Sequence, residues 1–389
     1  MTHQKSYCSS FILFTSLIFI WGFITVLVDS RIPRLRELFT LSYFQAGLVQ
    51  FAFFGAYFLL SIPASYILSK IGYKKGIIRG LCTMSLGCLL FYPAASYRIF
   101  GFFMLAYFIL AGGMTILQVA ANPYVAVLGT EDGASSRLNL SQAFNSLGTA
   151  IAPAVGALFI LSDKIKTEVE INTLVGVAKD NYLVSEAAAV QRPFVGLAIF
   201  IFIIAGIFFF AKLPKLINEK TVGSYRDALK NKNLMLGVLG IFVYVGAEVA
   251  IGSYLVNYFL DMNLVPLVRE SPTMMNIANT VAKVFNKSLE GADDKALLGI
   301  FVIFYWSGAM IGRFVGSYLT KIIKPGTVLG IFATLAITLI LISMNTVGYV
   351  AMWSILAVGL FNSIMFPTIF TLAIDGLGEL KPKASGLLC

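Results

Sequence analysis

Residues 111–161 read AGGMTILQVAANPYVAVLGTEDGASSRLNLSQAFNSLGTAIAPAVGALFIL and predict two consecutive membrane-spanning helices. Two apolar segments flank a short polar loop over residues 129–137. Polar groups are costly inside a membrane unless they form hydrogen bonds, so amides within such segments must bond either a ligand or another helix. The apolar segments here contain four carboxamide side chains: Gln118, Asn122, Gln142 and Asn145.

Each predicted helix carries its two amides on one face. The first pair is four residues apart and the second pair is three apart, spacings that bring side chains together on a helix. Carboxamides both donate and accept hydrogen bonds, which suits a ligand rich in hydroxyl groups. Hydrogen bonding between helices is the alternative for any single amide. Four amides in two consecutive helices favour a ligand site.

The composition of the 389 residues is that of a polytopic membrane protein. Hydrophobic residues make up 58% and charged residues only 12%, with a mean hydropathy of +0.85, whereas a soluble domain holds about 25% charged residues. A spanning helix needs about 20 apolar residues. Runs with at most one charge predict an all-α membrane fold of about ten such helices, over 6–28, 38–69, 80–97, 99–130, 138–162, 193–211, 233–260, 296–312 and, as two helices, 325–374.

The residue types also exclude several kinds of function. His3 is the only histidine, and the four cysteines lack metal-ligand spacing, so we expect neither a metal nor an organic cofactor. The sequence contains no HExxH motif and no Ser–His pair, so we expect no enzyme. The net charge of +10 arises in short loops and predicts no nucleic-acid partner.

Basic residues are unevenly divided between the loops. If the N-terminus lies in the cytoplasm, 17 of the 29 Lys and Arg residues, Arg313 among them, fall in inner segments. Inner loops of membrane proteins are enriched in Lys and Arg, so this division predicts a cytoplasmic N-terminus.

Two motifs in the opening stretch carry a resemblance to a known family. They read Gln118-Val-Ala-Ala-Asn122-Pro123-Tyr124 and Arg137-Leu-Asn-Leu-Ser-Gln142-Ala-Phe-Asn145-Ser. They resemble the fucose–galactose–glucose:proton symporters of the major facilitator superfamily, and the likeness extends from Trp21 to the C-terminus. The resemblance implies a fold of six plus six helices.

The resemblance also implies how the chain is divided. Residues 1–211 would form the first six-helix half, 212–232 the cytoplasmic linker, and 233–389 the second half. Residues 384–389 resemble the start of an eleventh helix. We therefore expect four complete helices in the second half and a chain that is truncated at its C-terminus.

Two acids lie in or at the end of predicted spans, Asp29 and Glu248. In the resembling family an acid at the position of Asp29 takes the transported proton, the coupling ion; it usually follows Asn, whereas here it follows Val28. The alternative for Asp29 is a helix-end acid paired with Arg31, Arg34 or Arg36. Glu248 lies in the middle of an apolar span, where an acid indicates function by default. It is a sugar ligand or a second coupling acid, with a structural, hydrogen-bonded Glu as the alternative.

The remaining candidate residues lie in the seventh and tenth predicted spans. Tyr244 and Asn257 belong to the seventh, and Asn362 and Phe366 precede Pro367 in the tenth. The resemblance implies that the amides contact sugar hydroxyls and that the two rings stack on a pyranose, with lipid or core packing as the alternative for each ring. Pro367 lacks a backbone N–H and so frees a carbonyl within the span.

Together these features imply a hexose:proton symporter that works by alternating access. Gln118 together with Glu248 resembles the glucose/galactose branch, since fucose-type members carry an acid at the position of Gln118. We expect a monomer in the bacterial inner membrane, whose partners are a sugar (glucose, galactose or fucose), protons and the lipid bilayer. An uncoupled sugar facilitator and a drug-type antiporter of the same fold are the alternatives.

Overall fold

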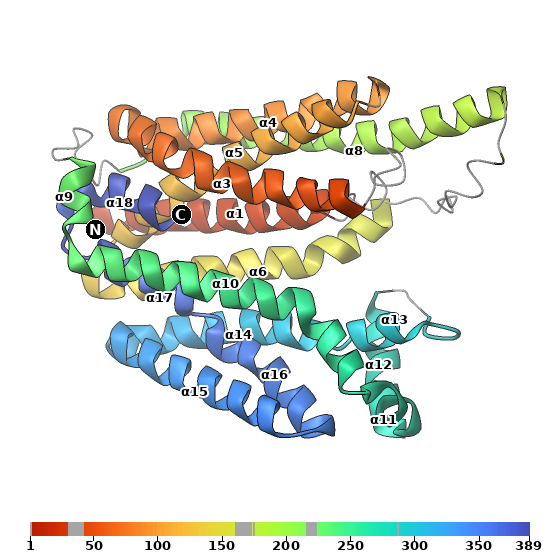
Figure 1. Ribbon diagram of the computed structural model, residues 1–389. Coiled ribbons are helices and arrows are strands. Elements are labelled where there is room, and N and C mark those ends of the chain that lie inside the picture. Colours follow the sequence, from red (N-terminus) through yellow and green to blue (C-terminus); the bar gives the residue numbers. More distant parts are fainter. Residues whose placement is uncertain are drawn as a thin grey trace.

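The computed structural model describes residues 2–29, 43–97, 99–159, 173, 176–214, 224–285 and 288–389. Its described residues form a bundle of long helices and no strand (Figure 1). The N-terminal helices are α1 (Thr2–Asp29), α3 (Tyr43–Ile71), α4 (Tyr73–Tyr97), α5 (Phe100–Val127), α6 (Ala134–Phe159) and α8 (Val177–Phe210). After the short α9 come α10 (Lys232–Asp261), α11 (Leu264–Glu270), α12 (Pro272–Val284), α13 (Asp294–Gly299), α14 (Val302–Ile322), α15 (Pro325–Asn345), α16 (Gly348–Asn362), α17 (Met365–Ile374) and α18 (Lys381–Leu388).

The predicted spans correspond to these helices. Within the described ranges, nine helices or helix pairs are long and apolar enough to cross a membrane. The 26-residue α6, predicted as the fifth span, runs beside them (Figure 1). The prediction of an all-α polytopic membrane protein is therefore confirmed.

Packing divides the bundle into two groups of helices. In the first group α4 packs on α5 and α8, α3 packs on α5, and α1 packs on α6. In the second group α16 packs on α14 and α15, while α10 packs on α17. Contacts of α6 with α14 and α17, and of α18 with α3 and α5, join the two groups. The boundaries 1–211, 212–232 and 233–389 remain a prediction, because residues 215–223 lie outside the described part.

Glycine allows two pairs of helices, α6 with α1 and α14 with α16, to approach closely. A Cβ atom at Gly148 of α6 would collide with the carbonyl oxygen of Phe19 in α1. In the second group, a Cβ at Gly312 of α14 would collide with the Leu360 carbonyl of α16. Small residues at such crossings are typical of membrane bundles, where close backbone contact replaces the hydrophobic effect.

Several helices contain a proline, and at two of them, Pro123 and Pro367, another helix supplies a donor to the carbonyl that the proline leaves free. Pro123 cannot donate to the carbonyl of Val119, and Ser385 Oγ of α18 donates to that oxygen at 2.9 Å. Pro367 cannot donate to the carbonyl of Ser363, which lies in the break between α16 and α17. Arg313 Nε donates there at 3.1 Å. The tenth predicted span is thus two helices.

Hydrogen bonds between the two groups gather at one end of the bundle. We call it the α9 end, because α9 (Tyr225–Leu229) lies there, with both chain ends nearby (Figure 1). Near the start of α6, the Ser135 and Thr371 hydroxyls lie 2.5 Å apart, and Asn139 Nδ2 donates to Thr368 Oγ1 at 3.0 Å. Ser317 Oγ donates to a carbonyl of α6 at 2.9 Å. These bonds hold the two groups together at the α9 end.

Candidate functional site

A cavity of about 350 Å³ lies between the two groups of helices. Its volume is within the range of small-molecule sites. Helices α1, α3, α5 and α6 supply one wall, and α10, α14, α17 and the end of α18 supply the other. The lining residues are Trp21, Gly22, Thr25, Phe53, Phe54, Tyr57, Gln118, Gln142, Asn145, Thr149, Ile241, Tyr244, Val245, Glu248, Arg313, Phe366, Leu388 and Cys389.

Two larger hollows lack this set of groups. One of about 690 Å³ lies at the α9 end, between the α5–α6 loop and the ends of α14 and α17. Another, of about 760 Å³, is lined almost wholly by apolar side chains of α3, α10 and α18. Neither contains a residue of the predicted site, so the central cavity is the candidate.

Six of the predicted residues line the central cavity together. They are Gln118, Gln142, Asn145, Tyr244, Glu248 and Phe366. Asn122 lies directly behind Gln142, whose Nε2 donates to Asn122 Oδ1 at 3.3 Å. Asn122 is completely buried, and its Nδ2 has no hydrogen-bond partner. The spacing argument thus brought both amide pairs to one place.

Each amide of α6 also bonds within the protein. Asn145 Nδ2 donates to the Ile18 carbonyl of α1 at 2.8 Å, and Gln142 bonds to α5 as described. Hydrogen bonding between helices, the alternative to a ligand site, is therefore realised in part. These bonds fix the orientation of amides whose side chains border the cavity, which is the preorganisation that a binding site needs.

Two other predicted residues lie away from the cavity. Asn257 is exposed on α10, nine residues beyond Glu248 and so about 13 Å further along the helix. Asn362 is buried at the end of α16, where its Nδ2 donates to Tyr305 Oη at 2.6 Å and its Oδ1 has no partner. Neither lines the cavity.

Asp29 is the last residue of α1, and its side chain lies outside the described residues. Its proposed role in proton coupling therefore stays a prediction. Within the described part of the chain, no group of three or more His, Cys, Asp or Glu side chains is placed to hold a metal ion.

Arg313 lies elsewhere than its count among the basic residues of the inner segments predicts. It was counted with the basic residues of the inner segments, but it lies within α14 and faces the cavity. Its Nη2 lies 4.0 Å from Glu248 Oε1, and the two side chains are only 16% and 18% exposed. The available signal was that Arg313 stands between the apolar run 296–312 and the uncharged residues 314–320, because a cation inside a span requires an anionic or carbonyl partner.

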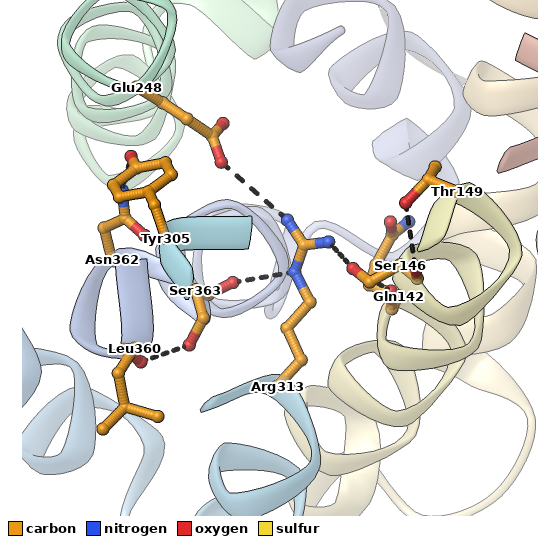
Figure 2. A network of polar contacts seen from close by, with 9 residues as sticks. All are labelled: Gln142, Ser146, Thr149, Glu248, Tyr305, Arg313, Leu360, Asn362 and Ser363. Carbon is orange, nitrogen blue, oxygen red and sulfur yellow. Dashed lines mark hydrogen bonds and ion pairs between the residues drawn. The ribbon is translucent and has the colours of Figure 1, made fainter. Parts of the chain in front are cut away.

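The guanidinium of Arg313 joins three elements (Figure 2). Besides Glu248 of α10, it contacts the Ser363 carbonyl through Nε, and its Nη1 donates to Ser146 Oγ of α6. Ser146 belongs to the first group of helices and the other two partners to the second. Arg313 therefore bridges the two groups at the cavity itself.

Tyr244 lies one helical turn before Glu248 on α10. Its Oη is buried beside the Glu248 carboxylate without a hydrogen bond of good geometry. An unbonded hydroxyl in the wall of a cavity costs free energy unless a ligand or water satisfies it. Together with the amides, the cavity offers neutral donors and acceptors, one carboxylate, and aromatic rings.

Comparisons with known proteins agree with this arrangement. The sequence profile described as Major Facilitator Superfamily matches residues 7–388. The glucose/galactose transporter of Brucella abortus is 45% identical over 392 residues, covering 99% of this chain and 85% of that one. The L-fucose-proton symporter of Escherichia coli is 35% identical over 385 residues, covering 97% and 82%. A crystal structure of the transporter FucP in the outward conformation matches with a TM-score of 0.84 at 32% identity, covering 98% of this chain and 88% of that one.

Proposed function

This chain belongs to the major facilitator superfamily, and on that premise we propose that it is a secondary active transporter of a hexose together with protons. Relatives named as a glucose/galactose transporter and an L-fucose-proton symporter support both parts of the proposal. Gln118 is neutral, which favours glucose or galactose over fucose as the cargo.

The observation that carries the proposal is the composition of the cavity wall. Carboxamides of α5 and α6 face a carboxylate of α10 across a space of about 350 Å³. A hexose presents hydroxyls around its rim and an apolar ring face, so it needs neutral donors, acceptors and aromatic rings. Trp21, Phe53 and Phe366 supply the rings. The Asn122 Nδ2, which has no partner, and the Tyr244 Oη, which lies beside the Glu248 carboxylate, support the proposal as groups that a ligand could bond.

The bonds between the two groups explain how such a site is exposed to one side at a time. The groups are joined at the α9 end by neutral bonds such as Ser135–Thr371 and Asn139–Thr368. Each such bond contributes only about 1 kcal/mol, so rocking of one group against the other is energetically accessible. With the α9 end in the cytoplasm, this arrangement is the outward-facing one, the conformation in which FucP was crystallised. The protein acts as a monomer in the inner membrane, with a cytoplasmic N-terminus.

Proton coupling rests on Asp29 at the end of α1. An ionised carboxylate resists transfer through the dry intermediate state by several kcal/mol. Protonation removes this resistance, so the loaded carrier crosses only with its proton bound.

Uptake into proteoliposomes tests the proposal. The purified 389-residue chain is reconstituted, and labelled glucose, galactose and fucose are supplied with an acidic external pulse. We expect one or more sugars to accumulate above the external concentration, and a protonophore to abolish the accumulation. Equilibration without accumulation would support the uncoupled facilitator instead. No saturable uptake of any of the three sugars would refute hexose transport.

A further inference from the structure

Arg313 occupies an unusual position for a charged residue. It lies in the middle of a membrane-spanning helix, lines the cavity, and has a side chain only 16% exposed. A guanidinium remains charged at every physiological pH. A buried charge is tolerated only with compensating partners, and those partners therefore indicate what Arg313 does.

The three partners are supplied by different features of the fold. Glu248 supplies the only carboxylate among the described cavity-lining side chains, at 4.0 Å. The Ser363 carbonyl is available only because Pro367 has no N–H to occupy it. Ser146 supplies a hydroxyl from α6. The planar fork of Arg reaches all three at once, which a single Lys nitrogen does not.

The surroundings of Glu248 leave Arg313 as its one cationic neighbour among the described residues. Tyr244 from the same helix and Tyr305 from α14 lie close to its carboxylate. Tyr57 of α3 and Cys389 after α18 face the same cavity. Protonation of Glu248 would leave the guanidinium buried with only a carbonyl and a hydroxyl as partners, which is unfavourable.

We infer that Arg313 is a positioning residue that orients the Glu248 carboxylate as an acceptor for sugar hydroxyls, so that Glu248 contacts the sugar and does not carry the coupling proton. The inference rests on the proposed sugar transport. It decides between the two roles that remained open for Glu248. The break at Pro367 contributes to this arrangement, because the freed Ser363 carbonyl accepts from Arg313 and orients the guanidinium toward the carboxylate.

The first experiment measures coupling in the Glu248→Gln variant. Sugar affinity should fall about tenfold or more, because a charged hydrogen bond is lost. At saturating sugar, accumulation driven by a pH gradient should nevertheless persist. Loss of accumulation with retained sugar counterflow would identify Glu248 as the proton carrier and overturn the inference. Absence of any sugar binding by the unmodified chain would instead overturn the proposed function, and the inference with it.

The second experiment tests Arg313 directly by equilibrium binding of labelled galactose and glucose between acidic and alkaline pH. In Arg313→Gln, Glu248 loses its cation and protonates in acid, so binding should weaken as the pH falls. The double variant Arg313→Gln/Glu248→Gln is the matched control, because every other titrating group is common to both. We expect the additional pH dependence of the single variant, about tenfold across the range, to disappear in the double variant.

Arg313→Lys separates charge from geometry. It keeps a cation beside Glu248 but loses the fork, so its binding should be weaker while showing no additional pH dependence. Parallel pH profiles for Arg313→Gln, the double variant and the unmodified chain would overturn the inference. A merely structural role for Arg313 predicts that outcome, with lower protein yield and unchanged pH profiles in the folded fraction. The Glu248→Gln experiment decides the question even if Arg313→Gln does not fold.

Discussion

Replacement of Gln142 by Ala separates the two uses of the buried amides. Gln142 borders the cavity, is 7% exposed, and donates through Nε2 to the fully buried Asn122 at 3.3 Å. If Gln142 also bonds a sugar hydroxyl, its loss affects binding as well as stability. If it serves only to join α5 and α6, its loss affects stability alone.

The structure sets the expected magnitudes. The bond to Asn122 is long and neutral, and the variant leaves Asn122 without its partner, so unfolding should become easier by about 1–3 kcal/mol. Loss of a sugar contact should weaken the free energy of sugar binding by about 1–3 kcal/mol, which raises Kd about 5- to 150-fold.

Equilibrium binding and thermal unfolding of the purified variant provide the two measurements. Ser141→Ala is the matched control. Ser141 directly precedes Gln142 on α6 and shares a buried hydrogen bond of 2.9 Å with Thr15 of α1, but it does not border the cavity. The control should be destabilised by about 1 kcal/mol and should keep its sugar affinity. Equal sugar affinity in Gln142→Ala and the control would refute the ligand role of Gln142.

Three further predictions concern coupling, gating and topology. Asp29→Asn should abolish sugar accumulation while counterflow exchange continues; accumulation in response to a pH gradient would exclude Asp29 as the coupling acid. Ser385→Ala removes a hydrogen bond that joins the two groups through α18 and α5, so the α9 end should open more often and hydrogen exchange should increase in the first turn of α6, which lies there. The control is Ser85→Ala, whose lost bond to the Ala198 carbonyl lies within the first group. Ser288→Cys, in a chain whose four native cysteines are serine, should react with a membrane-impermeant maleimide from outside the cell; reaction only from inside would reverse the orientation.

The spans were predictable because each depends on the sum over some 20 residues rather than on any single one. The grouping of the amides around one cavity was predictable because polar residues in apolar segments are few, and helical spacing places Gln142 and Asn145 on one face. The same period argues against Asn257: nine residues at 3.6 per turn place it about 180° around α10 from Glu248. Applied to that pair, the helical period separates Asn257 from Glu248, and Asn257 does not line the cavity.

The pairing of Arg313 with Glu248 was beyond the reach of pattern reasoning. The two residues belong to different helices, and their contact depends on the crossing of α10 and α14. At the edge of an apolar run, an Arg is read as a loop residue. Its three partners are fixed by tertiary structure, including a carbonyl whose availability depends on Pro367.

The proline-freed carbonyls of Val119 and Ser363 also constrain the order in which the chain can assemble in a bilayer. An unsatisfied backbone group in hydrocarbon costs several kcal/mol. Arg313 precedes the Ser363 carbonyl, so this acceptor enters a membrane that already contains its donor. Val119 precedes its donor Ser385 by 266 residues. During synthesis the fourth span must therefore hold its open carbonyl near water or another donor until α18 has been made and docks on α5.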